Sequence, residues 1–221
     1  MKEKIVVVIP AYNEAKYIEK VVKRAKAVAD EVVVVDDRSK DNTEAVARKA
    51  GAIVVRLLAN MGAGFSTRIG CDLALKRGAD IIATIDADGQ HEPEDIPKML
   101  SILKKEDLDI IFGSRQRDKN MPIIKRIGNW GLSTLTKMLF NININDSQTG
   151  FHVFTKKAYP RLRWDSSRYG VVSEFVVKVA KSNLRFIEVP IKTIYTDKKT
   201  GMNKKDALKS AVKMVKWRLE K

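Results

Sequence analysis

The first half of the chain repeats one pattern, a short run rich in Val and Ile followed by a segment with helical spacing. The apolar runs occupy residues 5–9, 32–35, 53–57, 81–85 and 108–112. Such β-branched runs without polar alternation are typical of strands buried on both faces of a sheet. Helices are predicted over residues 14–29, 41–49, 64–76 and 93–103. The alternation predicts an α/β fold with a mostly parallel sheet and with ligands at the carboxyl ends of its strands.

The alternation ends after Gly113. A helix is predicted over residues 123–140, strands over 151–154 and 186–194, a helix over 173–181 and a basic helix over 203–219. No repeat, low-complexity tract or linker-like segment divides the chain. We therefore expect a single domain over residues 1–221.

Composition restricts the kinds of site that the chain can build. Cys71 is the only cysteine, which excludes an intramolecular disulfide. His91 and His152 are the only histidines, which excludes a histidine-rich metal centre. No signal-peptide pattern opens the sequence, and no apolar run approaches the roughly 18 residues that span a bilayer. A soluble or peripheral protein is expected.

Charge is distributed unevenly along the chain. Residues 1–114 hold 18 Lys and Arg against 19 Asp and Glu, whereas residues 115–221 hold 24 against 8. The positive excess of the second half suits a polyanion, namely nucleic acid, anionic lipid or a phosphorylated substrate. A solvated basic surface is the simpler alternative, and charge alone does not choose between them.

Two carboxylates follow the fourth apolar run, in the segment Thr-Ile-Asp-Ala-Asp-Gly-Gln-His of residues 84–91. Asp86 and Asp88 are two residues apart, so on an extended chain their side chains project to the same side. A bridging Mg²⁺ or Mn²⁺ would let this pair bind a diphosphate and stabilise it as a leaving group. The structural alternative is that Asp86 caps the following helix.

The first apolar run ends in Ile-Pro-Ala-Tyr-Asn-Glu, residues 9–14. Tyr12 offers a flat surface to a nucleotide base, and Glu14 offers a carboxylate to donors of the base or ribose. In the structural alternative, Asn13 caps the helix that follows.

The second apolar run ends in Val-Val-Asp-Asp-Arg-Ser, residues 34–39. Asp37 is the stronger candidate for a hydrogen bond to ribose or base. The structural alternative is a helix cap formed by Asp36 or Ser39, while Asp41 is a further candidate cap for the same helix.

The fifth run leads into Gly113, Ser114 and Arg115. An arginine fork at the end of a buried strand suits a phosphate group. The alternative is a salt bridge between Arg115 and one of the aspartates of residues 84–91.

Together these motifs resemble glycosyltransferase family 2, and within it the dolichol-phosphate mannose synthase branch of polyprenyl-phosphate glycosyltransferases. The matching stretches are residues 9–14, 34–43, 86–93, 113–115, 146–151, 173–175 and 188–191. The resemblance implies a GT-A fold, which is Rossmann-like and nucleotide-binding, with a mostly parallel central sheet flanked by helices. Residues 1–114 would bind the nucleotide sugar and residues 115–221, with their basic C-terminal helix, the acceptor.

The resemblance also assigns roles to single residues. The nucleoside would be held by Pro10, Tyr12, Glu14 and Asp37. The diphosphate and a Mg²⁺ or Mn²⁺ ion would be held by Asp86, Ala87, Asp88 and Gln90, with Asp86, Asp88 and Gln90 as metal ligands. Arg115, helped by Lys125 or Arg126, would meet the acceptor phosphate. Asp88 and Arg115 would be the catalytic residues.

One stretch departs from the family. Relatives often carry an arginine-rich segment before Gly-x-Ser-Lys, whereas this chain has Lys198 and Lys199 before Gly201, then Asn203 and Lys204. Lysine is a point charge and holds phosphate with a different geometry. An electropositive acceptor pocket is accordingly predicted from Arg115, Lys125, Arg126, Lys198 and Lys204. The Gln-x-x-Arg-Trp signature of processive polymerases is absent.

The implied reaction is an inverting transfer of a hexose from GDP-mannose or UDP-glucose to a polyprenyl or dolichyl phosphate. Such an enzyme would lie peripherally at the cytoplasmic face of a membrane, with or without an anchoring partner, and would bind no nucleic acid. The last helix has a matching apolar stripe of Leu208, Ala211, Val212, Val215 and Leu219 among lysines. In the alternative, this stripe packs on the sheet.

Three other functions remain open at this point. A family 2 enzyme with a non-lipid acceptor has the same donor motifs. A nucleotidyltransferase would usually show a glycine-rich loop near the first strand, which residues 9–14 lack. A basic nucleic-acid-binding protein would explain the charge but not the acidic motifs at three strand ends.

Overall fold

The Val- and Ile-rich runs form the central strands of one seven-stranded sheet of order β3-β2-β1-β4-β6-β5-β7. The computed structural model describes residues 2–115, 123–167, 170–194 and 204–219, without the side chains of residues 123–127, 129 and 204–207. The strands are β1 (Ile5–Ala11), β2 (Glu31–Asp36), β3 (Ile53–Arg56), β4 (Ile81–Thr84), β5 (Ile110–Arg115), β6 (His152–Thr155) and β7 (Phe186–Ile191). Neighbours are parallel except β6, which runs antiparallel to β4 and β5. The predicted mostly parallel α/β sheet is confirmed.

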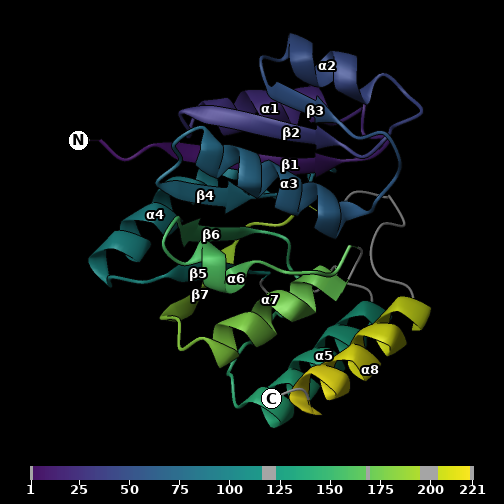
Figure 1. Cartoon of the computed structure of the whole chain (residues 1–221), viewed down its shortest axis with the longest axis vertical. Coiled ribbons are helices and arrows are strands. Elements are labelled where there is room, and N and C mark those ends of the chain that lie inside the picture. Colours follow the sequence, from purple (N-terminus) through teal and green to yellow (C-terminus); the bar gives the residue numbers. More distant parts are fainter. Residues whose placement is uncertain (1, 116–122, 168–169, 195–203, 220–221) are drawn as a thin grey trace.

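Helices cover both faces of this sheet (Figure 1). They are α1 (Ile18–Lys26), α2 (Thr43–Lys49), α3 (Ala63–Lys76), α4 (Ile96–Lys105), α5 (Ile123–Phe140), α6 (Tyr159–Leu162), α7 (Gly170–Lys181) and α8 (Lys204–Leu219), with a 3₁₀ turn at Pro93–Asp95. The short helix α6 was not predicted.

The side-chain alternation of β1 shows how the two layers of core arise. Val7 and Ile9 point into a cluster with α1 and α4, whereas Val6 and Val8 point into a second cluster with α3, α6 and α7. Each such buried side chain stabilises the fold by about 1.5–3 kcal/mol. Gly70 lets α3 lie close to β1, because a Cβ there would be 2.3 Å from Cγ1 of Val8.

Three predicted helix starts differ from the structure by three residues or more, and one of them is that of α7, which begins at Gly170 rather than at residue 173. The carbonyl of Glu14 accepts hydrogen bonds from the amides of Tyr17 and Ile18, so a turn comes first and α1 begins at Ile18 rather than at residue 14. Asn13 does not cap α1, since the N-cap position is Tyr17 and Asn13 has a φ of 55°. The helix predicted from residue 93 begins with the 3₁₀ turn, and its regular part starts at Ile96.

Helix α8 packs on α5 and α7 rather than on the sheet, which corrects one of the two expectations for its apolar stripe. Leu208, Val212 and Leu219 are 67%, 63% and 79% exposed, whereas Ser210 and Met214 are buried. Helices α5 and α8 lie side by side at one end of the molecule, with α7 between them and the sheet (Figure 1). The apolar stripe of α8 therefore faces outward.

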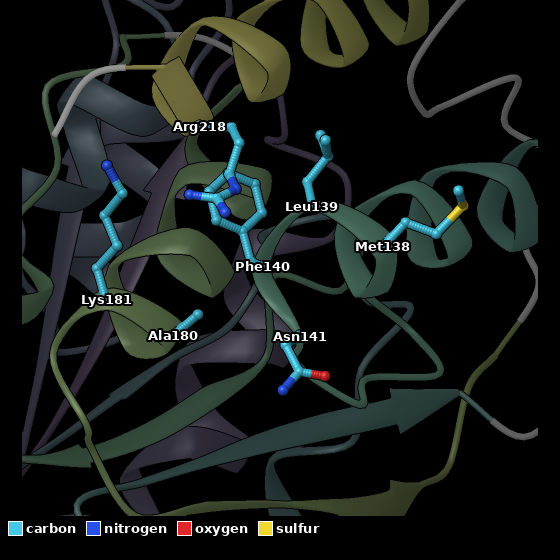
Figure 2. A pocket seen from close by; sticks show the side chains of 7 residues that line it. All are labelled: Met138, Leu139, Phe140, Asn141, Ala180, Lys181 and Arg218. Atoms are coloured by element: carbon cyan, nitrogen blue, oxygen red, sulfur yellow. The ribbon is translucent and has the colours of Figure 1, made fainter.

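A hollow of about 300 Å³ lies among α5, α7 and α8. It is lined by Met138, Leu139, Phe140, Asn141, Ala180, Lys181 and Arg218 (Figure 2). None of the predicted site residues lines it. In the described part of the chain, no helix combines the length and the apolarity needed to cross a bilayer.

Candidate active site

The sheet order brings the predicted motifs to one edge. β1, β2 and β4 are adjacent and parallel, so the segments that follow Ala11, Asp36 and Thr84 leave the sheet side by side. β6 is antiparallel, so its first residue, His152, lies opposite Thr84 at this same edge. β5 also ends here, at Arg115. The nucleoside, metal and acceptor motifs therefore share the carboxyl edge, where ligands of open α/β sheets gather.

The segment predicted to bind a metal follows β4, which ends at Thr84. Asp86 and Asp88 are partly exposed and Ala87 between them is buried, which is the alternation expected of an extended chain. The alternative role of Asp86 as a helix cap is wrong, because Glu92 holds the N-cap position of the next helical turn. Both carboxylates thus lie at the surface of the sheet edge.

Gln90 donates two hydrogen bonds to the carboxylate of Asp88. Its backbone amide donates to Oδ1 of Asp88 at 3.0 Å and its side-chain Nε2 donates to Oδ2 at 2.7 Å. Gly89 allows the turn with a φ of 74°. Gln90 therefore orients Asp88, which is compatible with its predicted place in a metal site.

His91 and Gly150 both lie against Asp86. Nδ1 of His91 lies 3.4 Å from the amide of Asp86 and 3.7 Å from its Oδ2. Burial lowers the pKa of His91 to about 4, so the imidazole is neutral near pH 7 and forms no ion pair there. Desolvation raises the pKa of Asp86, and the positive charge of Arg115 opposes that shift.

A divalent cation fits this loop. Two partly exposed carboxylates two residues apart are the protein share of a site that takes its remaining ligands from water and a diphosphate. In the described ranges, no group of three or more His, Cys, Asp or Glu side chains gathers as a closed cage. Asp86, Asp88 and Gln90 are therefore the residues that would hold the ion.

The two segments predicted to bind the nucleoside are joined by hydrogen bonds. The amide of Asn13 donates to Oγ of Ser39 at 2.9 Å, and the amide of Lys40 donates to Oδ1 of Asn13 at 2.7 Å. The amide of Glu14 donates to Oγ1 of Thr43 at 2.8 Å. These bonds give Asn13 and Ser39 structural roles other than helix capping, and they fix the two loops as one unit.

The predicted nucleoside residues differ in exposure. Tyr12 is 41% exposed, while Pro10 and Glu14 are half-buried. Asp37 is only 3% exposed, and its oxygens accept the amides of Met61 and Gly62 at 2.7 and 2.8 Å. Asp37 therefore anchors the loop before α3, and its contact with a nucleoside stays a prediction.

The helix cap predicted within residues 34–39 also differs from what the structure shows. Asp36 accepts the amide of Ser39 within a local turn and does not reach α2. Oδ1 of Asp41 accepts the amide of Thr43, the first residue of α2, at 3.0 Å. Asn42 is the N-cap of α2, so Asp41 lies one residue before the cap position and the predicted Asp41 cap is wrong.

Arg115 pairs with Asp146, not with the partner that the sequence suggested. Nε and Nη2 of Arg115 donate to Oδ2 and Oδ1 of Asp146 at 2.7 and 2.8 Å. The guanidinium lowers the pKa of Asp146 against the opposing effect of burial. Asp146 lies in the matching stretch of residues 146–151 but was given no role, because its pairing across 31 positions has no local signal.

The other predicted acceptor residues cannot be placed. Lys198 lies outside the described residues, and so do the side chains of Lys125, Arg126 and Lys204. Lys125 and Arg126 belong to the first turns of α5, and Lys204 begins α8. Their contribution to a phosphate pocket stays a prediction.

Proteins of known sequence resemble this chain over most of its length. An uncharacterised protein of Methanocaldococcus jannaschii is 43% identical over 89% of this chain and 84% of its own. The UDP-N-acetylglucosamine–dolichyl-phosphate N-acetylglucosaminyltransferase of Methanococcus voltae is 36% identical over 89% of this chain and 88% of its own. The undecaprenyl-phosphate mannosyltransferase of Micrococcus luteus is 27% identical over 91% and 87%.

Among solved structures, the fold matches glucosyl-3-phosphoglycerate synthase of Mycobacterium tuberculosis. Its complex with Mg²⁺ and UDP superposes with a TM-score of 0.75 at 18% identity, covering 99% of this chain and 79% of that protein. That synthase has also been crystallised with Mn²⁺ and UDP. The GT-A fold is therefore confirmed.

A family model matches most of the chain. The model of glycosyl transferase family 2 matches residues 6–163, which include the predicted nucleoside segments, the predicted metal loop and Arg115 with Asp146. The chain belongs to glycosyltransferase family 2.

Proposed function

We propose that this glycosyltransferase moves a hexose from a nucleotide diphosphate to a polyprenyl or dolichyl phosphate. The observation that carries the proposal is that Arg115 ends β5 at the sheet edge that also holds Asp86 and Asp88. The names of the Methanococcus and Micrococcus relatives support a polyprenyl-phosphate acceptor. Family membership removes the basis for a nucleotidyltransferase.

The donor half would bind the nucleotide sugar with residues whose loops are held by hydrogen bonds within the fold. Tyr12, Pro10 and Glu14, with Asp37, would hold the nucleoside of GDP-mannose or UDP-glucose. A Mg²⁺ or Mn²⁺ ion on Asp86, Asp88 and Gln90 would neutralise the diphosphate as it leaves. The relative named for UDP-N-acetylglucosamine adds that donor to those worth testing.

The acceptor half would place a nucleophile that is already charged. A phosphate monoester has a second pKa of about 6, so near pH 7 its oxygen attacks the anomeric carbon without a general base. The bond from that carbon to the diphosphate breaks with inversion. Cations are needed to position the acceptor, and Arg115, Lys125, Arg126, Lys198 and Lys204 would supply them.

Membrane contact follows from a lipid acceptor. Leu208, Val212, Val215 and Leu219 form an outward apolar stripe on α8, and Lys209, Lys213 and Lys216 on the same helix are also exposed. Apolar side chains enter the interface while lysines meet anionic headgroups. We infer that α8 lies on an anionic bilayer at its cytoplasmic face, alone or with an anchoring partner.

The donor is tested first by thermal stabilisation with Mn²⁺ and a panel of GDP, UDP, GDP-mannose, UDP-glucose and UDP-N-acetylglucosamine. Stabilisation by one nucleotide series, dependent on Mn²⁺ and lost in Asp88→Ala, is expected. The matched control is Asp72→Asn on α3, outside the predicted site, which should respond like the wild type. Stabilisation by no nucleotide would contradict the donor site.

The acceptor is tested with the donor that the first experiment identifies. Sugar transfer to a short polyprenyl phosphate in detergent is expected, whereas the corresponding polyprenol should not react because it lacks the phosphate. Arg115→Ala should raise the KM for the lipid phosphate by about tenfold or more, since a charge-assisted bond is lost. Transfer to a free phosphorylated acid in preference to the lipid would instead indicate a non-lipid acceptor.

A further inference from the structure

Arg115 is fixed along one edge of its guanidinium. Besides the two side-chain bonds to Asp146, its backbone amide donates to Oδ2 of Asp146 at 3.1 Å. The Asp146 side chain is 6% exposed and that of Arg115 is 21% exposed. A paired fork of charge-assisted bonds sets the plane of a guanidinium as well as its place.

Asp146 is itself held by Glu188 on the neighbouring strand. Oε1 of Glu188 accepts the backbone amide of Asp146 at 2.8 Å. Oε2 of Glu188 accepts both the backbone amide and the side-chain amide of Asn145 at 2.8 Å. Glu188 lies on β7 and Arg115 lies at the end of β5. Because these two strands pair with each other, both residues belong to the same part of the sheet.

Arg115 lies at the sheet edge that also carries the predicted metal loop. β5 ends at Arg115, and β4, two strands away in the sheet, ends at Thr84, which leads into Asp86 and Asp88. The arginine predicted to meet the acceptor phosphate and the carboxylates predicted to hold a cation therefore lie at one edge of the sheet. A side chain that meets a reacting phosphate must keep its orientation, because small displacements weaken that contact.

From these contacts we propose that Asp146 is a positioning residue, which sets the orientation of Arg115 for the acceptor phosphate, and that Glu188 holds Asp146 in place. The inference rests on the proposed transfer to a phosphate. Stability alone explains the pair poorly, because a buried ion pair adds little over apolar side chains of similar volume. A pre-oriented arginine loses less conformational entropy when a phosphate binds, which lowers the KM for that phosphate.

The first test compares Asp146→Asn with the wild type in the full chain. The KM for polyprenyl phosphate should rise about tenfold or more, as expected for a lost charge-assisted bond, while Mn²⁺-dependent stabilisation by the nucleotide stays within about twofold. Glu188→Gln should raise the same KM by a smaller factor and serves as the second variant if Asp146→Asn does not fold. Equal losses of acceptor and nucleotide binding would overturn the inference and indicate a general structural role.

A double-mutant cycle separates positioning from structure. If Asp146 acts through Arg115, then Asp146→Asn should not change the acceptor KM further in an Arg115→Ala background. Independent, multiplying effects would overturn the inference. Asp72→Asn, which breaks the Asp72–Arg163 pair, is the matched control and should leave the acceptor KM unchanged.

The cycle also distinguishes this inference from the proposed function. An unchanged acceptor KM in Arg115→Ala would show that Arg115 does not meet the acceptor, and both statements would fall. A raised KM in Arg115→Ala together with an unchanged one in Asp146→Asn and Glu188→Gln would leave the proposed function standing and overturn the positioning role alone.

Discussion

Gly150 lies against the carboxylate of Asp86, and no larger residue fits between them. A Cβ at this position would be 2.8 Å from Oδ1 and 3.0 Å from Oδ2 of Asp86. Gly150→Ala should therefore displace the carboxylate and lower the apparent affinity for Mn²⁺ by roughly tenfold or more, with sugar transfer reduced in parallel. Titrating Mn²⁺ against nucleotide-dependent thermal stabilisation measures this.

The control for Gly150 is a glycine with free space. A Cβ on Gly131, in α5, meets nothing within 4 Å. Gly131→Ala should keep the wild-type Mn²⁺ response and add stability of up to about 1 kcal/mol, because alanine favours a helix. A wild-type Mn²⁺ response in Gly150→Ala would show that Asp86 tolerates displacement or holds no ion.

His152 should make stability depend on pH. It is buried, stacks on Phe175 at 4.9 Å, and its Nδ1 has no hydrogen-bond partner in the described structure. Burial lowers its pKa to about 3, against about 6.5 when unfolded. Below about pH 6.5 the unfolded chain binds a proton at His152, whereas the folded chain does not. The free energy of unfolding therefore falls, by about 2 kcal/mol at pH 5.

His152→Phe isolates that contribution. Phenylalanine can occupy the same place among Phe112 and Phe175 and does not titrate. Urea unfolding at pH 7 and pH 5 should therefore show a smaller loss of stability in the variant than in the wild type. Carboxylates titrate in both proteins and cancel in the comparison. Equal losses would mean that His152 accepts a proton in the folded state.

At the scale of helices and strands, the sequence predicted whatever depends on local pattern. The five apolar runs all became strands, because β-branched side chains favour an extended backbone. Helix α5 has its predicted ends. Errors arose where tertiary contacts decide: α1 starts late because the carbonyl of Glu14 first closes a turn, and the outward face of α8 depends on packing against α5 and α7.

The residues of the candidate site also divide into those that a local pattern predicts and those that only tertiary contacts reveal. Asp86 and Asp88 were identifiable because their spacing and their place after a strand carry the chemistry. The partners Asp146, Glu188 and Gly150 were not assigned roles, because each acts on a residue at least 31 positions away. Asp146 and Gly150 precede β6 and Glu188 lies in β7, so these contacts depend on how β6 and β7 pair with β4 and β5, and no local pattern encodes that register.

Helix α8 is the element whose proposed role is most directly testable. Val212→Glu together with Leu219→Glu puts two carboxylates on the outward stripe, so binding to vesicles rich in phosphatidylglycerol should fall by roughly tenfold or more. Wild-type binding should also weaken with added salt, because lysines contribute. Leu58→Glu, at a side chain that is 97% exposed in the other half, is the matched control and should bind as the wild type.

For the whole molecule, the sheet order bears on whether the two functional halves are separable. β6, from the second half, lies between β4 and β5, which both come from the first half. A fragment of residues 1–114 would lack β6 and β7, leaving β4 as an open edge and β5 without a partner strand. Exposed apolar edges of this kind promote aggregation, so the fragment should not fold alone.

The intact chain should instead unfold in one step, and its tryptophans allow a direct test. Trp130, Trp164 and Trp217 all lie in residues 115–221, so their fluorescence reports the second half, whereas far-ultraviolet circular dichroism reports helices and strands of both. Because the shared sheet couples the halves, the two signals should give the same urea midpoint. A fluorescence midpoint clearly below that of circular dichroism would show that the acceptor half unfolds first and that residues 1–221 are not one cooperative unit.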